Sequence, residues 1–533
     1  MVAAVCAYWA AVTVILAVTI NKNQGHLVYG LDDAYIHMAI AKNAAIHHVW
    51  GVTRFGFTSS TSSPLWTFLL AGAYLVFGVN EWSPLVLNLL FGTLTLVCAY
   101  VFLAKHINRA AHWLIFLVLL TAVTVTPMPW MTVIGMEQLL HALLTLCFVF
   151  IAAEQLSSSK RETPRGRILL LVLAPLLSMT RYEGLFVVLV VCVLLLTRKR
   201  ALYSAGIGVV ALAPVVAYGF WSVSHGWFFL PNSLLLKGHR PDASSLSGIA
   251  SLLGLRALTG IWHNPHLMVL LGAALLQLIY LRFKRRNALD PGRAYASLAF
   301  VGAILLHVQF ASSGWGYRYE SYLVVLGVVT VSTSLSDLLF AIRAWNLGRR
   351  ALLRYAPGIP LLMVLAALFH SVAYRSVIAP QAMTNIFEQQ FQMGLFLRRF
   401  YPGRTVAVND IGAVCYLADV RLLDLFGLGT VETARSKLQG QYSTRVISDL
   451  AQERQVDVAI VYDRWLRHYS GGIPAEWIRI GQWKIQHNLV CGDNSISLYA
   501  TTPSAADELT RNLKAFAADL PPDVGQFGTY VEE

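Results

Sequence analysis

Long apolar segments recur along the first 375 residues of this chain and decide most of what it can fold into. A helical membrane crossing takes about 20 apolar residues, and most of these segments reach or approach that length. The segments cover residues 2–20, 84–104, 112–127, 137–154, 168–179, 185–197, 203–223, 265–281, 294–311, 319–341 and 358–374. The whole chain is 56% hydrophobic and 13% charged, whereas soluble domains are about 45–50% apolar and about 25% charged. The sequence therefore predicts a polytopic α-helical membrane protein with about 11 spans.

The basic residues indicate how these spans are oriented. Short connectors on one side hold roughly 18 Lys and Arg residues, while the opposite connectors hold about eight. Because basic loops stay in the cytoplasm, the N-terminus is expected inside. The net charge of +13 therefore fits topology and anionic lipid better than nucleic acid. The segments expected outside are 21–83, 128–136, 180–184, 224–264, 312–318 and everything after about 376.

One apolar segment, residues 64–78, is too short for a confident span. Its length of about 15 residues is in the range of interfacial segments. Counting it as a span would place Lys105 and Arg109 outside and invert every later loop. We therefore expect it to lie along the outer surface as a juxtamembrane helix.

The region from 376 to 533 differs in composition, with dispersed charges and short apolar strands. Strands are expected at 405–408, 421–425 and 456–462, with a short helix at 412–417. This pattern predicts two domains, a transmembrane catalytic domain at 1–375 and a soluble extracytoplasmic α/β domain at 376–533. Cys415 and Cys491 lie in the second domain, where a disulfide between them is left open.

An acidic pair, Asp32 and Asp33, follows the first span directly. One aspartate at such a place is explained by helix capping, but a cap does not explain two. A carboxylate at the membrane edge is suited to act as a general base on an acceptor hydroxyl. Asp32 is the favoured base and Asp33 its partner, and the two roles can be exchanged. The partner would orient the base, raise its pKa or hold a divalent cation.

Three cationic residues lie in the outward loops, and each has a second interpretation. Arg181, Lys237 and Arg318 are candidates for binding a donor phosphate. Arg181 could instead form a salt bridge with Glu183. Lys237 could extend to lipid headgroups, and Arg318 beside tyrosines could be an interfacial anchor.

Other polar residues are expected to support this group. Glu137 at the outer edge of a span, Glu183, Tyr319 and Asn232 are expected to surround the reacting residues without contacting the donor directly. His37, His47 and His48 do not form a convincing metal site, because no carboxylate is placed with them in a defined pattern.

Taken in order along the chain, these motifs resemble those of the GT-C superfamily of membrane glycosyltransferases, in the bacterial branch that includes mycobacterial terminal arabinofuranosyltransferases. The resemblance covers most of the chain, and it depends on the order and shared side of short motifs. Relatives often have Arg-Pro-Glu-Gly where this chain has Arg181-Tyr182-Glu183-Gly184. The motifs are Leu31-Asp32-Asp33-Ala34-Tyr35-Ile36, Thr61-Ser62-Ser63-Pro64-Leu65-Trp66-Thr67, Gly135-Met136-Glu137, Arg181-Tyr182-Glu183-Gly184, Pro231-Asn232-Ser233 with Lys237, Arg318-Tyr319, Asp410-Ile411-Gly412-Ala413 and Asp424-Leu425-Phe426-Gly427-Leu428.

The resemblance implies spans around a lipid-facing groove, juxtamembrane helices and a soluble C-terminal domain. It also implies inversion at the anomeric carbon, with a polyprenyl phosphate as the leaving group. The expected activity is transfer of a sugar from a polyprenyl-phosphate donor to an envelope glycan, lipid or protein acceptor. The reaction would take place outside the cytoplasmic membrane, with membrane lipids but no nucleic acid as partners. A transporter or flippase of a lipid-linked sugar is the alternative, although the spans lack the buried charges expected of one.

Overall fold

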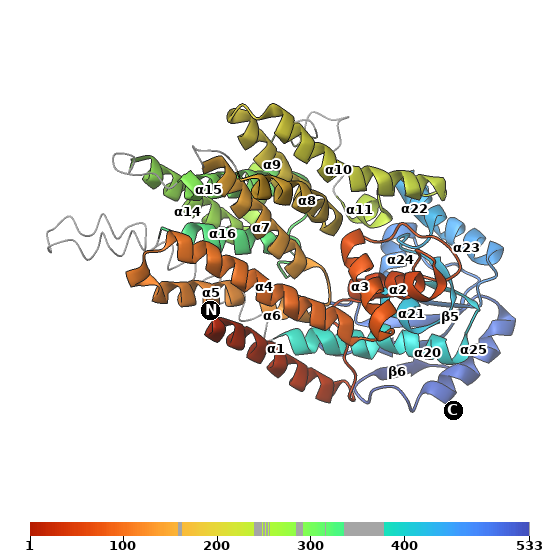
Figure 1. Cartoon of the computed structure of the whole chain (residues 1–533). Helices are drawn as coiled ribbons and strands as arrows, with labels where there is room; N and C mark the ends of the chain where they lie inside the picture. The colour runs from red at the N-terminus through yellow and green to blue at the C-terminus, as the bar shows by residue number, and fades with distance from the viewer. Residues whose placement is uncertain are drawn as a thin grey trace.

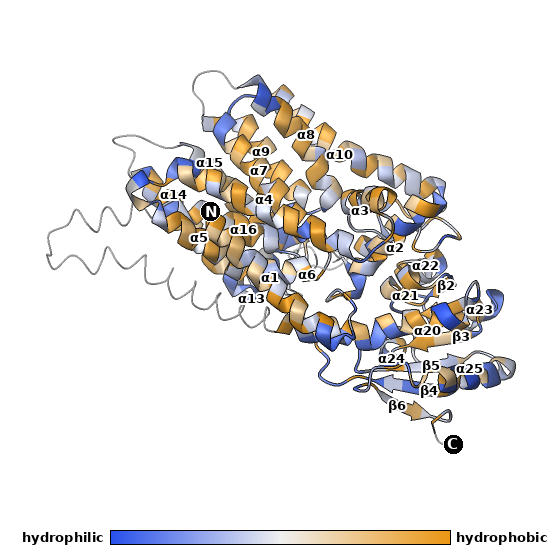
Figure 2. Cartoon of the chain, turned by 60° about the horizontal axis from the view of Figure 1, so that its bottom comes forward, coloured by the Kyte–Doolittle hydropathy of each residue, from blue (hydrophilic) through white to orange (hydrophobic). Residues whose placement is uncertain are grey.

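The computed structural model describes residues 1–157, 163–238, 248, 251, 254, 256–283, 291–314, 316–334 and 378–531. These residues form a bundle of apolar helices with a sheet-containing domain at one end (Figures 1 and 2). Hydrophobic residues dominate the helices of the bundle, whereas hydrophilic and hydrophobic residues mix along the sheet domain (Figure 2). The helices of the bundle are α1 (Val2–Lys22), α2 (Asp32–His47), α3 (Pro64–Phe77), α4 (Trp82–His106), α5 (Trp113–Val125), α6 (Met128–Val133), α7 (Gln138–Ser157), α8 (Pro164–Thr180), α9 (Gly184–Thr197), α10 (Ala201–Ser224), α11 (Asn232–Lys237), α13 (Arg256–His263), α14 (Pro265–Phe283), α15 (Pro291–Phe310) and α16 (Ser321–Ser332).

The chain is a multi-pass membrane protein, but a count of 11 spans is not established. Each expected span within the described residues falls on a helix, and the one at 358–374 lies outside them. Helices α5, α9 and α16 are apolar but shorter than a full crossing. Six helices of the described part are long and apolar enough to cross a membrane, namely α1, α4, α7, α10, α14 and α15.

Helix α7 is the centre of the bundle, where it packs against α4, α8, α15 and α16. Close contacts depend on small residues in its neighbours. At Gly92 of α4, an added Cβ would lie 2.3 Å from the Tyr8 hydroxyl oxygen of α1. That hydroxyl is hydrogen-bonded to Thr132 Oγ1 at 2.6 Å, so the glycine lets a buried polar group reach its partner.

Helices α2 and α3 lie between the bundle and the sheet domain (Figure 1). The segment expected to be interfacial forms α3, whose 14 residues pack against α2. Its other face exposes Phe68, Leu75, Val76 and Phe77. This short helix with an apolar outer face is suited to the membrane surface.

The sheet domain follows a helical segment that is described from residue 378 onward, passes through a π-helical turn (Phe387–Phe391) and ends in α20 (Gln392–Phe400). Its six strands have the order β2-β1-β3-β5-β4-β6, in which β2, β1 and β3 are parallel and the others antiparallel. The further elements are β1 (Thr405–Val408), α21 (Gly412–Leu417), β2 (Arg421–Asp424), α22 (Val431–Leu438), α23 (Thr444–Glu453), β3 (Val458–Val461), α24 (Asp463–Ser470), β4 (Ile478–Lys484), β5 (Ser495–Ala500), α25 (Pro503–Phe516) and β6 (Gly525–Gly528).

The expected strands and the helix at 412–417 are present, while β4, β5 and β6 were not anticipated. Cys415 and Cys491 are both free, so no disulfide joins them. In the parallel part, Val406 pairs with Leu422 and with Val458. The carboxyl ends of parallel strands meet at one edge, which is where α/β domains place their functional loops. Here that edge faces α2 and α11, as shown by hydrogen bonds described below.

Candidate functional site

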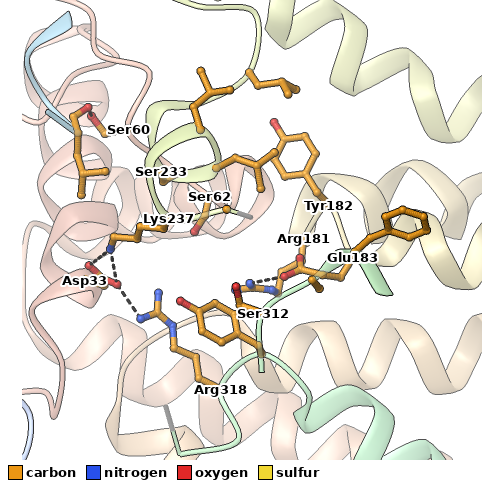
Figure 3. Close-up of a pocket in the computed structure, with 18 of the residues that line it drawn as sticks. Asp33, Ser60, Ser62, Arg181, Tyr182, Glu183, Ser233, Lys237, Ser312 and Arg318 are labelled. Carbon is orange, nitrogen blue, oxygen red and sulfur yellow. Dashed lines mark hydrogen bonds and ion pairs between the residues drawn. The ribbon is translucent and has the colours of Figure 1, made fainter. Parts of the chain in front are cut away.

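A pocket of about 500 Å³ lies where the loops that are expected outside meet the bundle. Figure 3 shows polar groups on two opposite sides of it and apolar side chains between them. Six of the predicted site residues line it, whereas Asp32, Glu137 and Asn232 do not belong to its lining. The six are Asp33, Arg181, Glu183, Lys237, Arg318 and Tyr319.

Asp33 forms the first polar side of the pocket, together with Lys237 and Arg318. Lys237 Nζ lies 2.9 Å from Asp33 Oδ1 and 3.0 Å from Oδ2, and Arg318 Nη1 lies 2.7 Å from Oδ2. Burial alone would raise the pKa of Asp33, but the two cations outweigh it and hold the pKa well below its usual range. Lys237 and Arg318 thus point to a carboxylate rather than to lipid headgroups.

Arg181 forms the second polar side, between two glutamates. It follows the last residue of α8, and its Nη1 lies 2.6 Å from Glu137 Oε1 while its Nη2 lies 2.8 Å from Glu183 Oε1. Burial would raise the pKa of Glu183, but Arg181 outweighs it and lowers the pKa to about 2. The salt bridge considered from the sequence is therefore present, and Glu137 is its third member.

Tyr319 separates the two polar sides. Its ring centroid lies 5.3 Å from the guanidinium carbon of Arg181 and 5.3 Å from that of Arg318. Both arginines therefore form cation–π contacts with the same ring, which hold the guanidinium groups in place without neutralising their charge.

His37 lies between the polar sides, although sequence reasoning considered it only as a metal ligand. Its Nδ1 is 3.1 Å from the hydroxyls of Thr61 and Thr67, and its Nε2 is 3.7 Å from Glu137 Oε2. Burial lowers its pKa, so the ring is neutral at neutral pH. Across the residues that the structure describes, no group of three or more His, Cys, Asp or Glu side chains is arranged to hold a metal ion.

Asp32 faces away from the pocket, toward the sheet domain. Its two carboxylate oxygens accept hydrogen bonds of 2.8 Å from the backbone N–H groups of Gly412 and Ala413. Burial and the nearby charge of Asp410 raise the pKa of Asp32 to about 8. Neither Asp32 nor Asp33 caps its own helix, since Leu31 is the N-cap of α2 and no side chain bonds there. The two adjacent aspartates therefore have opposite environments.

Asn232 supports Lys237 from the start of α11. Its backbone N–H donates to the Ser59 carbonyl at 2.8 Å, and its Nδ2 donates to the Gly427 carbonyl at 2.8 Å. Since α11 is only six residues long, these bonds position the whole helix and the lysine at its end.

Sequence reasoning missed most of the neutral lining of the pocket. Leu185, Phe186, Val215 and Phe310 supply an apolar wall, and hydroxyls come from Ser60, Ser62, Tyr182, Ser233 and Ser312. Leu428 of the sheet domain also reaches the pocket. In the sequence, the segment from Asp424 to Leu428 stood out only through the family resemblance. An isolated leucine or serine carries no chemical signal of its own.

Comparisons with known proteins extend this picture. A domain of unknown function (DUF8728) matches residues 384–499, which is most of the sheet domain. No curated protein matches the sequence. Among solved structures, ArnT from Cupriavidus metallidurans bound to undecaprenyl phosphate is 14% identical, with a TM-score of 0.50 over 94% of this chain and 98% of ArnT.

Two more distant structures are also similar. The oligosaccharyltransferase AglB from Archaeoglobus fulgidus, in complex with an inhibitory peptide and a dolichol-phosphate, is 13% identical with a TM-score of 0.47 over 94% of this chain and 74% of AglB. The mycobacterial arabinofuranosyltransferase AftD is 15% identical with a TM-score of 0.39, over 93% of this chain and 41% of AftD. The match to nearly the whole length of ArnT confirms, at the level of the fold, the resemblance noted in the sequence: this chain has the GT-C fold seen in ArnT.

Proposed function

We propose that this chain is an inverting glycosyltransferase that moves a sugar from a polyprenyl-phosphate donor to an envelope glycan, lipid or protein acceptor. The observation that carries the proposal is the Asp33 carboxylate inside the pocket, held by Lys237 and Arg318. The GT-C fold supports a glycosyltransferase in general. The proposed place is the extracytoplasmic face of the cytoplasmic membrane, which agrees with the basic loops expected inside.

The charges of the pocket favour one side of it for the donor phosphate. Lys237, Arg318 and Asp33 together carry a formal charge of +1, from two cations and one carboxylate. Arg181 with its two glutamates carries −1. A sugar–phosphate–lipid diester has one negative charge, so it is attracted to the first group, with the guanidinium of Arg318 suited to its oxygens. Arg181 is a secondary contact in this proposal, because two carboxylates already share its donors.

The apolar wall is suited to the lipid part of the donor. Leu185, Phe186, Val215 and Phe310 come from α9, α10 and α15, so the wall continues the apolar bundle up to the polar groups. A polyprenyl chain buried there leaves its phosphate at the pocket, where the cations lie.

Asp33 is the proposed general base, which exchanges the roles favoured from the sequence. It lines the pocket, while both oxygens of Asp32 are engaged by backbone N–H groups. In the proposed step, Asp33 takes the proton of the acceptor hydroxyl as that oxygen bonds to the anomeric carbon. The bond from this carbon to the phosphate oxygen breaks, and its electron pair leaves with the polyprenyl phosphate.

Lys237 and Arg318 serve both ends of this step. Negative charge disappears from Asp33 and grows on the leaving phosphate, so the same two cations can stabilise it before and after transfer. The donor phosphate also competes with Asp33 for these cations. Losing part of their attraction raises the pKa of Asp33, which makes the carboxylate a better base once the donor has bound.

A divalent cation is not required by this proposal. Both oxygens of Asp33 are already contacted by cationic side chains, and a metal ion would have to displace them. The sheet domain is proposed to help bind the acceptor. No observation favours the transporter alternative.

The proposal is tested with purified protein, a panel of radiolabelled polyprenyl-phosphate sugars and extracted envelope acceptors. We expect Asp33→Asn to lower transfer by about 10²–10⁴-fold, as loss of a general base does, with no effect of a chelator. Asp507→Asn, an exposed aspartate of α25, is the matched control. Transfer at the wild-type rate by a folded Asp33→Asn protein would overturn the base assignment. Movement of the lipid across a vesicle membrane without any sugar transfer would overturn the assignment as a glycosyltransferase.

A further inference from the structure

Helix α2 holds α21 of the sheet domain at both ends. Asp32 accepts hydrogen bonds from the first two residues of α21, Gly412 and Ala413. Lys42, further along α2, donates from Nζ to the carbonyls of Cys415 and Tyr416 near the end of α21, at 3.1 and 2.5 Å. The first N–H groups and last carbonyls of a helix have no partner within it. The positive charge of Lys42 at the end of α21 also matches the helix dipole.

Asp32 lies so close to Gly412 that no side chain would fit at position 412. A Cβ added at Gly412 would lie 2.0 Å from the Asp32 carbonyl oxygen and 2.7 Å from its Oδ2. The two backbones therefore meet directly, and Gly412 is needed for the approach rather than for a special backbone angle.

A second line of contacts joins the same edge of the sheet domain to the other side of Asp33. Ser60 Oγ donates to the Leu428 carbonyl at 2.7 Å, and Asn232 Nδ2 donates to the Gly427 carbonyl. Leu428 itself lines the pocket, and Asn232 begins the helix that ends in Lys237. The segments that follow β1 and β2 thus contact Asp32, which is next to the proposed base, and Asn232, which begins the helix that carries Lys237.

We infer that the sheet domain, with its segment of unknown function, is a structural part of the active site, and that Asp32 is the positioning residue that joins it to the base. The inference rests on the proposed function for the role of Asp33. Consecutive residues of a helix project about 100° apart, so fixing Asp32 against α21 fixes the direction in which Asp33 points. The two aspartates then have separate tasks, one holding the domain and the other taking the proton.

The docking contact is tested first without any substrate, by hydrogen exchange of the purified full-length protein. In the wild type, Asp32 protects the backbone N–H groups of Gly412 and Ala413. We expect Asp32→Ala and Gly412→Ala to accelerate exchange in peptides covering 409–418 by about tenfold or more, because the side chain of Asp32 no longer accepts the hydrogen bonds of these N–H groups. Gly56→Ala is the matched control, since a Cβ there meets nothing within 4 Å. Unchanged exchange in Asp32→Ala would overturn the inference, whatever the activity.

The second measurement separates positioning from catalysis through the side chain at position 32. Asn keeps one oxygen that can accept a hydrogen bond, whereas Ala keeps none and neither can take a proton. For a positioning residue, kcat falls about tenfold in Asp32→Asn and further in Asp32→Ala, while the thermal midpoint of Asp32→Asn and its affinity for undecaprenyl phosphate stay at wild-type values.

The possible failures point to different parts of the argument. If Asp32→Asn is as inactive as Asp33→Asn, Asp32 is itself the base and the inference is wrong, while glycosyl transfer stands. If kcat of Asp32→Asn equals that of the wild type, the contact does not position the base. If the wild type transfers no sugar at all, the proposed function fails, and hydrogen exchange alone decides whether Asp32 holds the domain.

Discussion

Two ion clusters face each other across the pocket, and they differ in what they can release (Figure 3). We call Asp33, Lys237 and Arg318 the exchange cluster, and Glu137, Arg181 and Glu183 the fixed cluster. Lys237 and Asp33 have side chains that are 32% and 21% exposed, whereas those of Arg181 and Glu137 are 6% and 0% exposed. Lys237 can leave Asp33 for a phosphate at small cost, because Arg318 stays beside the carboxylate, but Arg181 cannot leave Glu137 without stranding a buried charge.

The chain builds the two clusters differently. The fixed cluster comes from the start of α7 and the tight turn between α8 and α9, helices that pack directly against one another. The exchange cluster joins residues from α2, α11 and the loop before α16, which are far apart in sequence. The fixed cluster, held by packed helices, can keep a substrate in one position. The exchange cluster, built from separate segments, can change its ion pairs when the substrate binds.

The largest predicted difference between the clusters is in stability. Arg181→Gln leaves Glu137 and Glu183 buried without a cation, so we expect a loss of about 3–5 kcal/mol in the free energy of unfolding. Lys237→Gln leaves Asp33 paired with the buried Arg318, and because the side chain of Lys237 is 32% exposed we expect a loss of about 1 kcal/mol or less. Thermal unfolding in detergent measures both. Equal losses in the two variants would contradict the distinction between a fixed and an exchange cluster.

A smaller effect is expected in phosphate binding. Lys237→Met removes one of the two cations of the exchange cluster, so we expect the Kd for undecaprenyl phosphate to rise about tenfold, equivalent to about 1.4 kcal/mol. Lys484→Met, an exposed lysine of β4, is the matched control. If Lys237→Met bound the lipid phosphate as tightly as the control, the donor would have to lie nearer Arg181.

Much of this architecture could be predicted from the sequence. Hydropathy locates helices because every span buries its backbone polar groups within one segment, so the signal is local. The residues of both clusters also stood out, since charged side chains beside apolar spans are rare. The short strands at 405–408 and 458–461 are apolar and buried except at Thr405, whereas β4 and β6 mix polar and apolar residues toward one edge of the sheet.

The division of tasks between Asp32 and Asp33 could not be predicted. It depends on residues far away along the chain. Gly412 is 380 positions from Asp32, whereas Lys237 and Arg318 are 204 and 285 positions from Asp33. Two identical neighbouring side chains cannot be told apart by local sequence. Only in the folded chain does Asp32 lie at the start of α21, while Asp33 lies beside two cations.

The smallest predicted effect concerns pH and the domain contact behind the exchange cluster. Asp410 lies close to Asp32 and accepts hydrogen bonds from Gln390 and Tyr462 at 2.9 Å each. Burial raises the pKa of Asp410, and burial with the charge of Asp410 raises the pKa of Asp32 to about 8. Above their ordinary range near pH 4, these two groups therefore bind more protons in the folded protein than in the unfolded chain.

The contribution of these two carboxyl groups to stability should accordingly fall as the pH rises from 5 to 8, because they must lose protons that the fold retains. A buried neutral histidine such as His37 contributes in the opposite direction, so the effect of the pair is read from the difference between variant and wild type. Asp410→Asn removes one of the two carboxyl groups and lowers the pKa of the other by removing its charge. We expect its thermal midpoint to decrease less over this pH range than that of the wild type, with Asp507→Asn behaving like the wild type. If the midpoint of Asp410→Asn fell as steeply as that of the wild type, Asp32 and Asp410 would not cause the pH dependence of stability. A change in pH at the domain contact would then not affect the exchange cluster.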